Sequence, residues 1–182
     1  MAFARGLTRR EGLSDVCRFR FQDYRDVTGS FDHIVSIEMI EAVGEENWPT
    51  FFQSIHDRLN PGGTAIIQAI TMDEAAFERY RRKTDFIQRY IFPGGMLLTA
   101  ETMHRQAASA GLACENVRSF GNCYARTLQE WGDRFDASWS HIAEMGFDDR
   151  FRRKWQYYLA YCEAGFLDGI IDVGLFRLTK PG

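Results

Sequence analysis

The segment from His33 to Thr71 places the strongest constraint on the fold. An apolar, β-branched run at His33–Ile37 is followed by a helical pattern over Trp48–Leu59, a turn at Asn60–Gly63 and a second apolar run at Thr64–Thr71. A strand, a helix, a turn and a strand in this order form a βαβ unit, whose two strands lie parallel in one sheet with a right-handed crossover. The segment therefore predicts an α/β protein with a mostly parallel sheet and helices on both faces.

The flanking segments complete this prediction. Before the βαβ unit, Arg5–Gly12 has the pattern of the end of a helix, and Cys17–Phe21 alternates like a half-exposed strand. After it, an α-helical insertion at about residues 73–98 is expected to cover the sheet, with a polar and aromatic helix over Asp73–Tyr90. The remaining predicted elements are a helix at Thr99–Ala110, a strand near Glu115–Phe120, a long helical stretch at Thr127–Phe166 and a last strand near Val173–Thr179.

Composition excludes several classes of protein. With 182 residues, 45% of them hydrophobic, the chain can form one globular domain. A net charge of -3 gives no general attraction to nucleic acid, and the basic clusters at 81–83 and 152–154 are either solvated helix faces or contacts for an anionic surface. Four scattered cysteines without a CxxC pair favour reduced thiols and no metal site, which together with the lack of an apolar leader predicts a cytoplasmic location.

Two carboxylates, Glu38 and Glu41, follow the strand at His33–Ile37. In open α/β sheets, ligands bind outside the carboxyl ends of the strands, which makes both residues candidates for a site. A structural role is the alternative, because a carboxylate at a helix N-terminus is favoured by the helix dipole. Structural alternatives also exist for Gln68, as a polar strand end, and for Asp23, as a turn aspartate.

The order of six motifs along the chain is specific. They are QDYRD, FDHIVSIEMIEAVGEENW, LNPGGTAIIQAIT, DFIQRYIFPGGML, FGNCYARTLQEW and FRRKWQYYLAYCEAGF. In this order, the chain closely resembles the cyclopropane-fatty-acyl-phospholipid synthases, which are S-adenosylmethionine-dependent methyltransferases with a Rossmann-like fold. The resemblance extends from about Arg5 to Leu178.

This resemblance implies a reaction and its partners. The family transfers a methyl group from S-adenosylmethionine to the double bond of an unsaturated phospholipid acyl chain, and loss of a proton then closes a cyclopropane ring. The expected partner is therefore phospholipid at a membrane surface, with the protein peripheral to the inner face of the membrane. Two alternatives stay open: a non-catalytic lipid-binding or split-enzyme remnant, and methyl transfer to another small-molecule acceptor.

The resemblance also implies site residues. The family holds a bicarbonate-like anion as the base, and its glutamate and tyrosine correspond to Glu41 and Tyr124. The family's histidine is replaced by Gln68, which can donate an amide hydrogen bond but carries no positive charge. Gln22, Asp23 and Glu38 are the expected cofactor-binding residues, with Asp23 at the adenine amino group. Of the many aromatic residues, roughly half of which are expected to be core, those expected to contact the acyl chain are Tyr90, Phe92 and Tyr158.

One part of the family pattern has no counterpart. The first strand, its glycine-rich turn, the acidic residue after the second strand and the upstream cysteine of the anion site are all missing. In the family's strand order, 3-2-1-4-5-7-6, two positions would be empty between the strands at Cys17–Phe21 and His33–Ile37. The prediction is thus an incomplete class I methyltransferase sheet, in which residues 1–182 are the C-terminal part of a domain with weak activity alone. Truncation, a split enzyme and a degenerate relative are the three explanations, and the intact motif residues favour truncation over long drift. The partner would be a second copy or a complementary N-terminal half.

Overall fold

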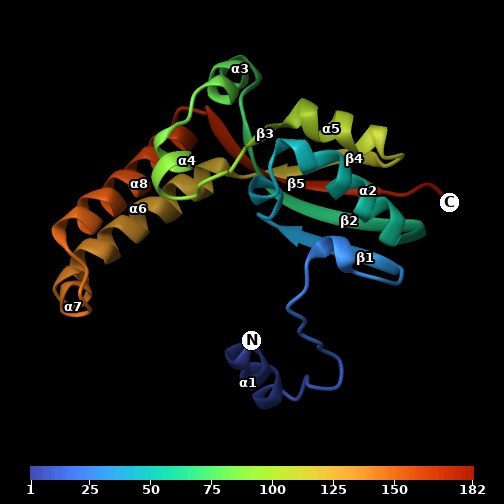
Figure 1. Ribbon diagram of the computed structural model, residues 1–182, viewed down its shortest axis with the longest axis horizontal. Helices are drawn as coiled ribbons and strands as arrows, with labels where there is room; N and C mark the ends of the chain where they lie inside the picture. The colour runs from blue at the N-terminus through green and yellow to red at the C-terminus, as the bar shows by residue number, and fades with distance from the viewer.

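The computed structural model describes all 182 residues and contains one five-stranded sheet between two layers of helices (Figure 1). Its main path runs β1-β2-β5-β4, and the short β3 also pairs with β2. The strands are β1 (Phe31–Ile37), β2 (Leu59–Met72), β3 (Leu98–Thr99), β4 (Ala113–Ser119) and β5 (Ile171–Thr179). The α/β class predicted from the sequence is confirmed.

Eight α-helices and three short 3₁₀ helices accompany these strands, and α1 and η1 precede the first of them. The 3₁₀ helices are η1 (Tyr24–Asp26), η2 (Ile40–Ala42) and η3 (Glu45–Asn47). The first four α-helices are α1 (Ala2–Arg10), α2 (Trp48–Arg58), α3 (Glu74–Arg82) and α4 (Phe86–Tyr90). The others are α5 (Ala100–Ser109), α6 (Gly121–Ala137), α7 (Trp139–Glu144) and α8 (Asp149–Leu167). None of the helices is both long enough and apolar enough to span a bilayer.

The βαβ unit forms as predicted. Strands β1 and β2 are parallel, with His33 opposite Thr64 and Ile37 opposite Gln68, and α2 connects them. β5 lies between β2 and β4 and is antiparallel to both, so it is the one strand with reversed direction. Because β1 and β2 run the same way, the residues that follow them meet at one edge of the sheet.

The two faces of the sheet have separate cores. On the face covered by α2 and α5, fifteen buried residues form the main core, which includes Phe52, Ile67 and Phe176. On the other face, α6 and α8 pack against β5 around a smaller core of five residues, including Leu128 and Phe166. Helices therefore cover β2 and β5 from both sides, as expected for strands that are apolar on both faces.

β1 lies at the edge of the sheet and pairs only with β2. Val35 and Ile37 are 67% and 54% exposed, so one face of this apolar strand is uncovered. The predicted strand at Cys17–Phe21 is wrong: these residues form no strand, and Phe21 is 96% exposed. A strand requires a partner for its backbone hydrogen bonds, and no strand of the sheet lies beside this segment.

Two predicted helices differ from the observed ones. The stretch at Thr127–Phe166 is divided into α6, α7 and α8, and Gly146, with a φ of 96°, lies in the turn before α8. The helix over Asp73–Tyr90 is divided into α3 and α4, because Asp85 caps α4 together with Gln88 in a capping box. Both breaks depend on local hydrogen bonds that an apolar periodicity does not reveal.

Candidate functional site

A polar cluster lies where β1 ends and α6 begins, beside Gln68, which lies within β2 and not at its end as the sequence suggested. Glu38, directly after β1, is the only non-glycine residue with a positive φ, at 48°. Its backbone N–H donates to the Gln68 carbonyl oxygen at 2.9 Å, which fixes the end of β1 to β2. A positive φ is costly for a residue with a side chain and often marks a functional site. Here it accompanies a sharp turn at the end of β1, where the Glu38 carboxylate reaches the polar cluster.

Glu38, Gln68 and Tyr124 form a closed triangle of hydrogen bonds. The Gln68 Nε2 atom donates to Glu38 Oε1 and to the Tyr124 hydroxyl, each at 2.8 Å, and the Tyr124 hydroxyl donates to Glu38 Oε1. Burial, and then the hydrogen bond to Glu38, raise the pKa of Tyr124 above its ordinary value of 10.0. The phenol is therefore a protonated hydrogen-bond donor at neutral pH.

Glu41 lies beside this triangle but is bound differently. Its Oε1 atom accepts a hydrogen bond from the Ile70 N–H at 2.7 Å, whereas its Oε2 atom is buried without a partner. Burial raises the pKa of Glu41, the Ile70 N–H partly opposes this rise, and the charge of Glu38 adds to it. An unpaired buried carboxylate oxygen is unfavourable, so this atom is suited to accept a hydrogen bond from a ligand.

Aromatic rings form a wall next to the cluster. Tyr124 lies 5.5 Å from Phe166, and Phe92 meets Tyr158 edge to face at 6.1 Å, measured between ring centroids. Burial, with smaller effects of Cys162 and Glu38, raises the pKa of Tyr158 to about 12. A polar group among aromatic faces can hold an apolar chain and also stabilise a cation.

The structure places the other predicted site residues elsewhere. Tyr90 is 47% exposed and contacts Phe86 and Arg89 at the surface instead of joining the wall. Asp23 accepts hydrogen bonds from the Arg25 N–H and guanidinium, and this guanidinium lowers the pKa of Asp23 to about 2. Gln22 Nε2 donates to the Asp26 carbonyl oxygen at 2.6 Å. Gln22 and Asp23 thus stabilise the η1 turn and form no hydrogen bond with the triangle.

A positioning residue that the sequence analysis missed is Asp172. Its Oδ1 atom accepts from the N–H groups of Gly121 and Val173, both at 2.8 Å. A carboxylate at the first residue of α6 is favoured by the helix dipole and fixes the turn that carries Tyr124. A Cβ atom on Gly121 would lie 2.5 Å from this oxygen, so the contact requires glycine. No local pattern indicates the pair, which is 51 residues apart.

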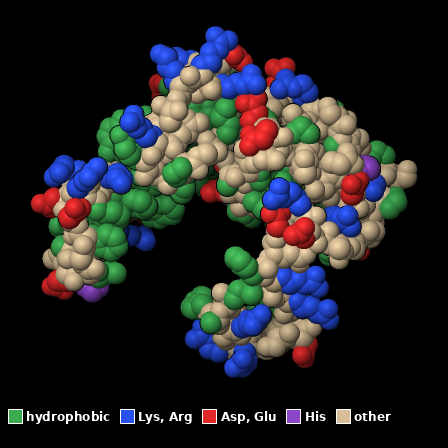
Figure 2. All heavy atoms as spheres, in the orientation of Figure 1, with side chains coloured by type: hydrophobic (Ala, Val, Ile, Leu, Met, Phe, Trp, Pro, Cys, Tyr) green, Lys and Arg blue, Asp and Glu red, His purple; other side chains and the backbone are tan.

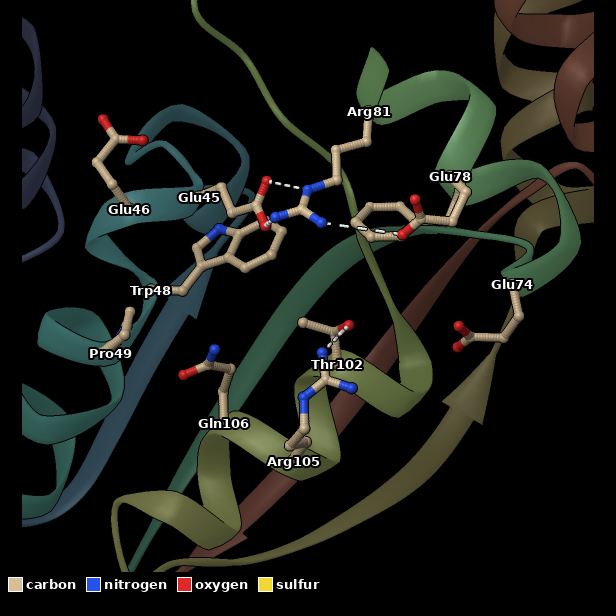
Figure 3. Close-up of a pocket in the computed structure, with 11 residues that line it drawn as sticks. Glu45, Glu46, Trp48, Pro49, Glu74, Glu78, Arg81, Thr102, Arg105 and Gln106 are labelled. Carbon is tan, nitrogen blue, oxygen red and sulfur yellow. Dashed lines mark hydrogen bonds and ion pairs between the residues drawn. The ribbon is translucent and has the colours of Figure 1, made fainter.

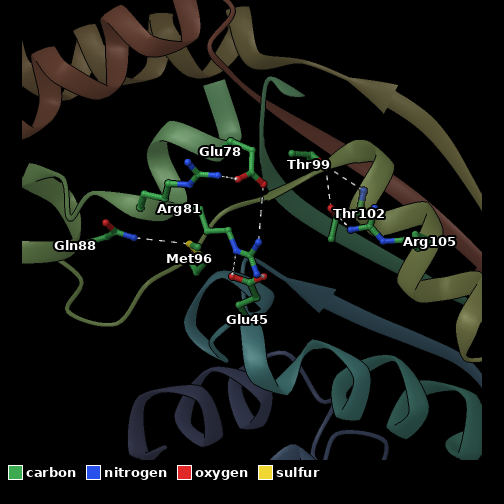
Figure 4. Close-up of polar contacts among 9 residues, drawn as sticks. Glu45, Glu78, Arg81, Gln88, Met96, Thr99, Thr102 and Arg105 are labelled. Atoms are coloured by element: carbon green, nitrogen blue, oxygen red, sulfur yellow. Dashed lines mark hydrogen bonds and ion pairs between the residues drawn. The ribbon is translucent and has the colours of Figure 1, made fainter. Parts of the chain in front are cut away.

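A wide hollow of the molecule lies away from this cluster. It has a volume of about 630 Å³ and is lined mostly by polar and charged side chains of η3, α2, α3 and α5 (Figure 3). Arg81 in this hollow is paired with Glu45 at 2.7 Å and with Glu78 at 3.9 Å (Figure 4). Four glutamates and two arginines line the hollow, and its few apolar side chains form no continuous wall for an acyl chain.

Comparison with known proteins identifies a matching family model and several related sequences. The family model described as mycolic acid cyclopropane synthetase matches residues 1–176. The tuberculostearic acid methyltransferase UfaA1 of Mycobacterium tuberculosis is 42% identical over 161 residues, which are 88% of this chain and 38% of the relative. The cyclopropane-fatty-acyl-phospholipid synthase of Escherichia coli is 35% identical over 150 residues, 80% of this chain and 36% of the relative. The chain thus spans less than half the length of these two relatives.

Solved structures show the same architecture. The mycolic acid cyclopropane synthase CmaA1, in complex with SAH and CTAB, has a TM-score of 0.80 and 27% identity, and the match covers 88% of this chain and 59% of that one. A putative sarcosine dimethylglycine methyltransferase from Galdieria sulphuraria has a TM-score of 0.79 at 15% identity, with 97% and 64% covered. At that identity the second likeness concerns the fold alone.

Proposed function

Because the chain belongs to the mycolic acid cyclopropane synthetase family of S-adenosylmethionine-dependent enzymes, we propose that it methylates the double bond of an unsaturated phospholipid acyl chain and closes a cyclopropane ring. One observation carries the proposal: hydrogen-bonding groups converge beside an aromatic wall at the carboxyl end of β1, next to Gln68 of β2. This combination serves a substrate that is apolar but must lose a proton.

When bound, S-adenosylmethionine would supply the methyl group to the double bond and leave as S-adenosylhomocysteine, and the residues around the acyl chain would then face a developing positive charge. The faces of Phe92 and Tyr158 would stabilise this charge and exclude water that would trap it. The Glu38 and Glu41 carboxylates add negative potential on the same side. Holding the chain in line with the methyl group is the main contribution, because an alkene is a weak nucleophile.

Ring closure requires removal of a proton from the transferred methyl group, whose C–H electron pair then forms the second carbon–carbon bond. The free Oε2 atom of Glu41 can accept the O–H hydrogen bond of bicarbonate and so orient that anion as the base. Gln68 and Tyr124 would donate hydrogen bonds to the same anion after their contacts with Glu38 rearrange. Such a positioned base contributes about 10²- to 10⁴-fold to turnover.

The residues of this chain fit only part of the cofactor. Asp23, the exposed N-cap of η1, retains lone pairs that could accept from the adenine amino group while it binds Arg25. For the ribose and the methionine carboxylate, the chain presents no strand that leads through a glycine-rich turn into a helix, and Glu38, the acidic residue after β1, already accepts hydrogen bonds from Gln68 and Tyr124. Cofactor binding by these 182 residues alone is therefore expected to be weak, as is their activity.

A second candidate is methylation of a fatty acyl chain without ring closure. Sequence identity favours this candidate, because this chain is 42% identical to the relative named as a tuberculostearic acid methyltransferase and 35% identical to the cyclopropane-fatty-acyl-phospholipid synthase. The two reactions share the methyl transfer and differ in which proton leaves. They can be distinguished because only a cyclopropane gives high-field ring protons in the NMR spectrum.

The test combines cofactor titration and product analysis. Calorimetry with S-adenosylmethionine measures binding, and vesicles of cis-unsaturated phosphatidylglycerol are then analysed for methylated acyl chains. A dissociation constant below about 1 mM, equivalent to about 4 kcal/mol, with ring protons in the product supports the proposal. A methylated chain without a ring supports the second candidate. If S-adenosylmethionine does not bind and no product forms, the proposal is contradicted, and the alternative of a non-catalytic lipid-binding protein is favoured.

A further inference from the structure

An exposed group of aromatic side chains extends from α4 to α8. We name it the aromatic patch, and it consists of Phe86, Tyr90, Phe92, Tyr157 and Tyr161. Four of its members are about half exposed: Tyr90 at 47%, Phe92 at 56%, Tyr157 at 52% and Tyr161 at 42%. Phe86 joins the two helices, since its ring centroid lies 4.5 Å from that of Tyr157 and 5.3 Å from that of Tyr90. Contiguous exposed aromatic surface of this kind marks an interaction site.

Cations surround the aromatic patch. Residues 79–97 contain five basic residues and one acidic residue, although the whole chain has a net charge of -3. The acidic residue, Asp85, already accepts a hydrogen bond from the Gln88 N–H. Arg79, Lys83 and Arg89 have no carboxylate within ion-pair distance, and the Arg89 guanidinium lies 5.5 Å from the Tyr90 ring centroid. Figure 2 shows hydrophobic side chains over α4, α6 and α8, with basic side chains beside them.

The aromatic patch is continuous with the candidate site. Phe92, at its inner end, contacts Tyr158, which belongs to the aromatic wall next to Glu38. The segment that carries Phe92 is held in place, because Gln88 Nε2 donates to the Gly95 carbonyl oxygen at 3.0 Å and the Leu97 N–H donates to the Tyr80 hydroxyl at 3.1 Å. An apolar chain that enters at the patch can thus reach the polar cluster along aromatic surface.

We propose that the aromatic patch, with Arg79, Lys83 and Arg89, is the surface by which this protein docks on an anionic phospholipid bilayer. Aromatic side chains with one polar end favour the boundary between headgroups and acyl chains, and lysine and arginine favour anionic headgroups. An acidic protein partner would satisfy the cations, but it would not require half-exposed aromatic rings on adjacent helices. The route from the patch to the site rests on the proposed function, whereas the docking itself does not.

Sedimentation with vesicles tests the docking without cofactor or turnover. Vesicles of phosphatidylcholine are compared with vesicles of equal parts phosphatidylcholine and phosphatidylglycerol. The protein should sediment with the anionic vesicles and bind the neutral ones at least ~10-fold more weakly, and added salt should release it. Equal binding to both vesicles, or no binding to either, would overturn the proposal.

Three variants locate the surface. Tyr90→Ser with Phe92→Ser should lower the vesicle partition coefficient ~10-fold, because it removes two exposed aromatic side chains. Arg79→Glu with Arg89→Glu should lower it as much and weaken its dependence on salt. Arg9→Glu with Arg10→Glu on α1 is the matched control and should bind like the wild type, with circular dichroism verifying the fold of each variant. Loss of binding in the α1 variant alone, or binding only to an acidic protein, would contradict the proposal.

Vesicle binding also separates this inference from the proposed function. If the protein sediments with anionic vesicles but does not bind S-adenosylmethionine, the docking surface is supported and the proposed enzymatic function is contradicted. Cofactor binding and product formation, without sedimentation that depends on the aromatic patch, would support the proposed function and contradict the docking surface.

Discussion

The region around β2 and β5 and the region around β1 differ in how they are covered. Helices pack on both faces of β2 and β5, and Ile67, Phe52 and Phe176 in this region are at most 1% exposed. β1 has a free edge and one uncovered face, and the preceding segment to Phe21 contributes no fully buried residue. Apolar side chains occur in both regions, so burial depends on whether a second layer covers them and not on hydrophobicity alone.

The candidate site lies on the boundary between these two regions. Gln68 and Tyr124 come from the covered region, where Asp172 fixes the first turn of α6. Glu38 comes from the end of the exposed strand and reaches them through a left-handed residue. The covered side of the site is thus preorganised by packing, whereas the β1 side is held mainly by its hydrogen bonds to β2.

The strongest test of this comparison is a matched pair of deletions. Phe52→Ala should lower the free energy of unfolding by about 3–5 kcal/mol, because it removes a fully buried ring from the main core. Phe21→Ala should change it by less than about 0.5 kcal/mol, since that ring is 96% exposed. Urea unfolding curves measure both values. A large loss from Phe21→Ala would mean that the segment before β1 packs against the protein in solution.

The next effect concerns activity at the boundary. In any preparation that shows turnover, Glu41→Gln should lower kcat about 100-fold or more and leave cofactor affinity unchanged, because it replaces a charged acceptor next to the triangle. Glu46→Gln, two residues before α2 and exposed, is the control and should keep normal turnover. Radiolabelled methyl transfer measures both rates. Should Glu41→Gln destabilise the fold and spare turnover per folded molecule, the carboxylate is a structural residue.

A smaller effect is the pH dependence of stability. Burial raises the pKa of Glu41 above its ordinary value of 4.5, so the folded state retains a proton that the unfolded state has already lost. Stability therefore falls as the pH rises from about 4.5 through the folded pKa, and it is constant above that range. The free energy of unfolding of the wild type, relative to Glu41→Gln, should decline across this window. Parallel pH curves for the two proteins would show that Glu41 is solvated like an ordinary carboxylate.

The smallest expected effect comes from the ion pair between η3 and α3 (Figure 4). The Arg81 and Glu45 side chains are 48% and 32% exposed. Arg81→Ala should cost less than about 1 kcal/mol at low salt, and the difference should shrink in high salt, because exposed ion pairs are screened. Chemical unfolding at two salt concentrations checks this. A loss as large as that of Phe52→Ala would show that this contact, more than the core, holds α3 in place.

Much of the fold could be predicted from periodicity. The apolar runs at His33–Ile37 and Thr64–Thr71 correctly placed two parallel strands and, with them, the edge at which Glu38, Glu41 and Gln68 lie. The alternating run at Cys17–Phe21 was wrongly predicted to be a strand, because the same alternation is compatible with a segment that has no partner strand. The hydrophobic pattern of a segment indicates which side chains could be buried, whereas strand formation also requires a neighbouring strand to pair with.

The sequence by itself determined the βαβ order, the motif order and the candidate residues Glu41, Gln68 and Tyr124. Only the tertiary structure brought Gln68 and Tyr124 together across 56 residues and added Glu38, across 30 residues, as their shared acceptor. It also separated Tyr90 from Tyr158, placing the first at the surface and the second in the wall. Local patterns follow from the backbone geometry of a few neighbouring residues, whereas hydrogen bonds between distant residues depend on how the strands and helices pack.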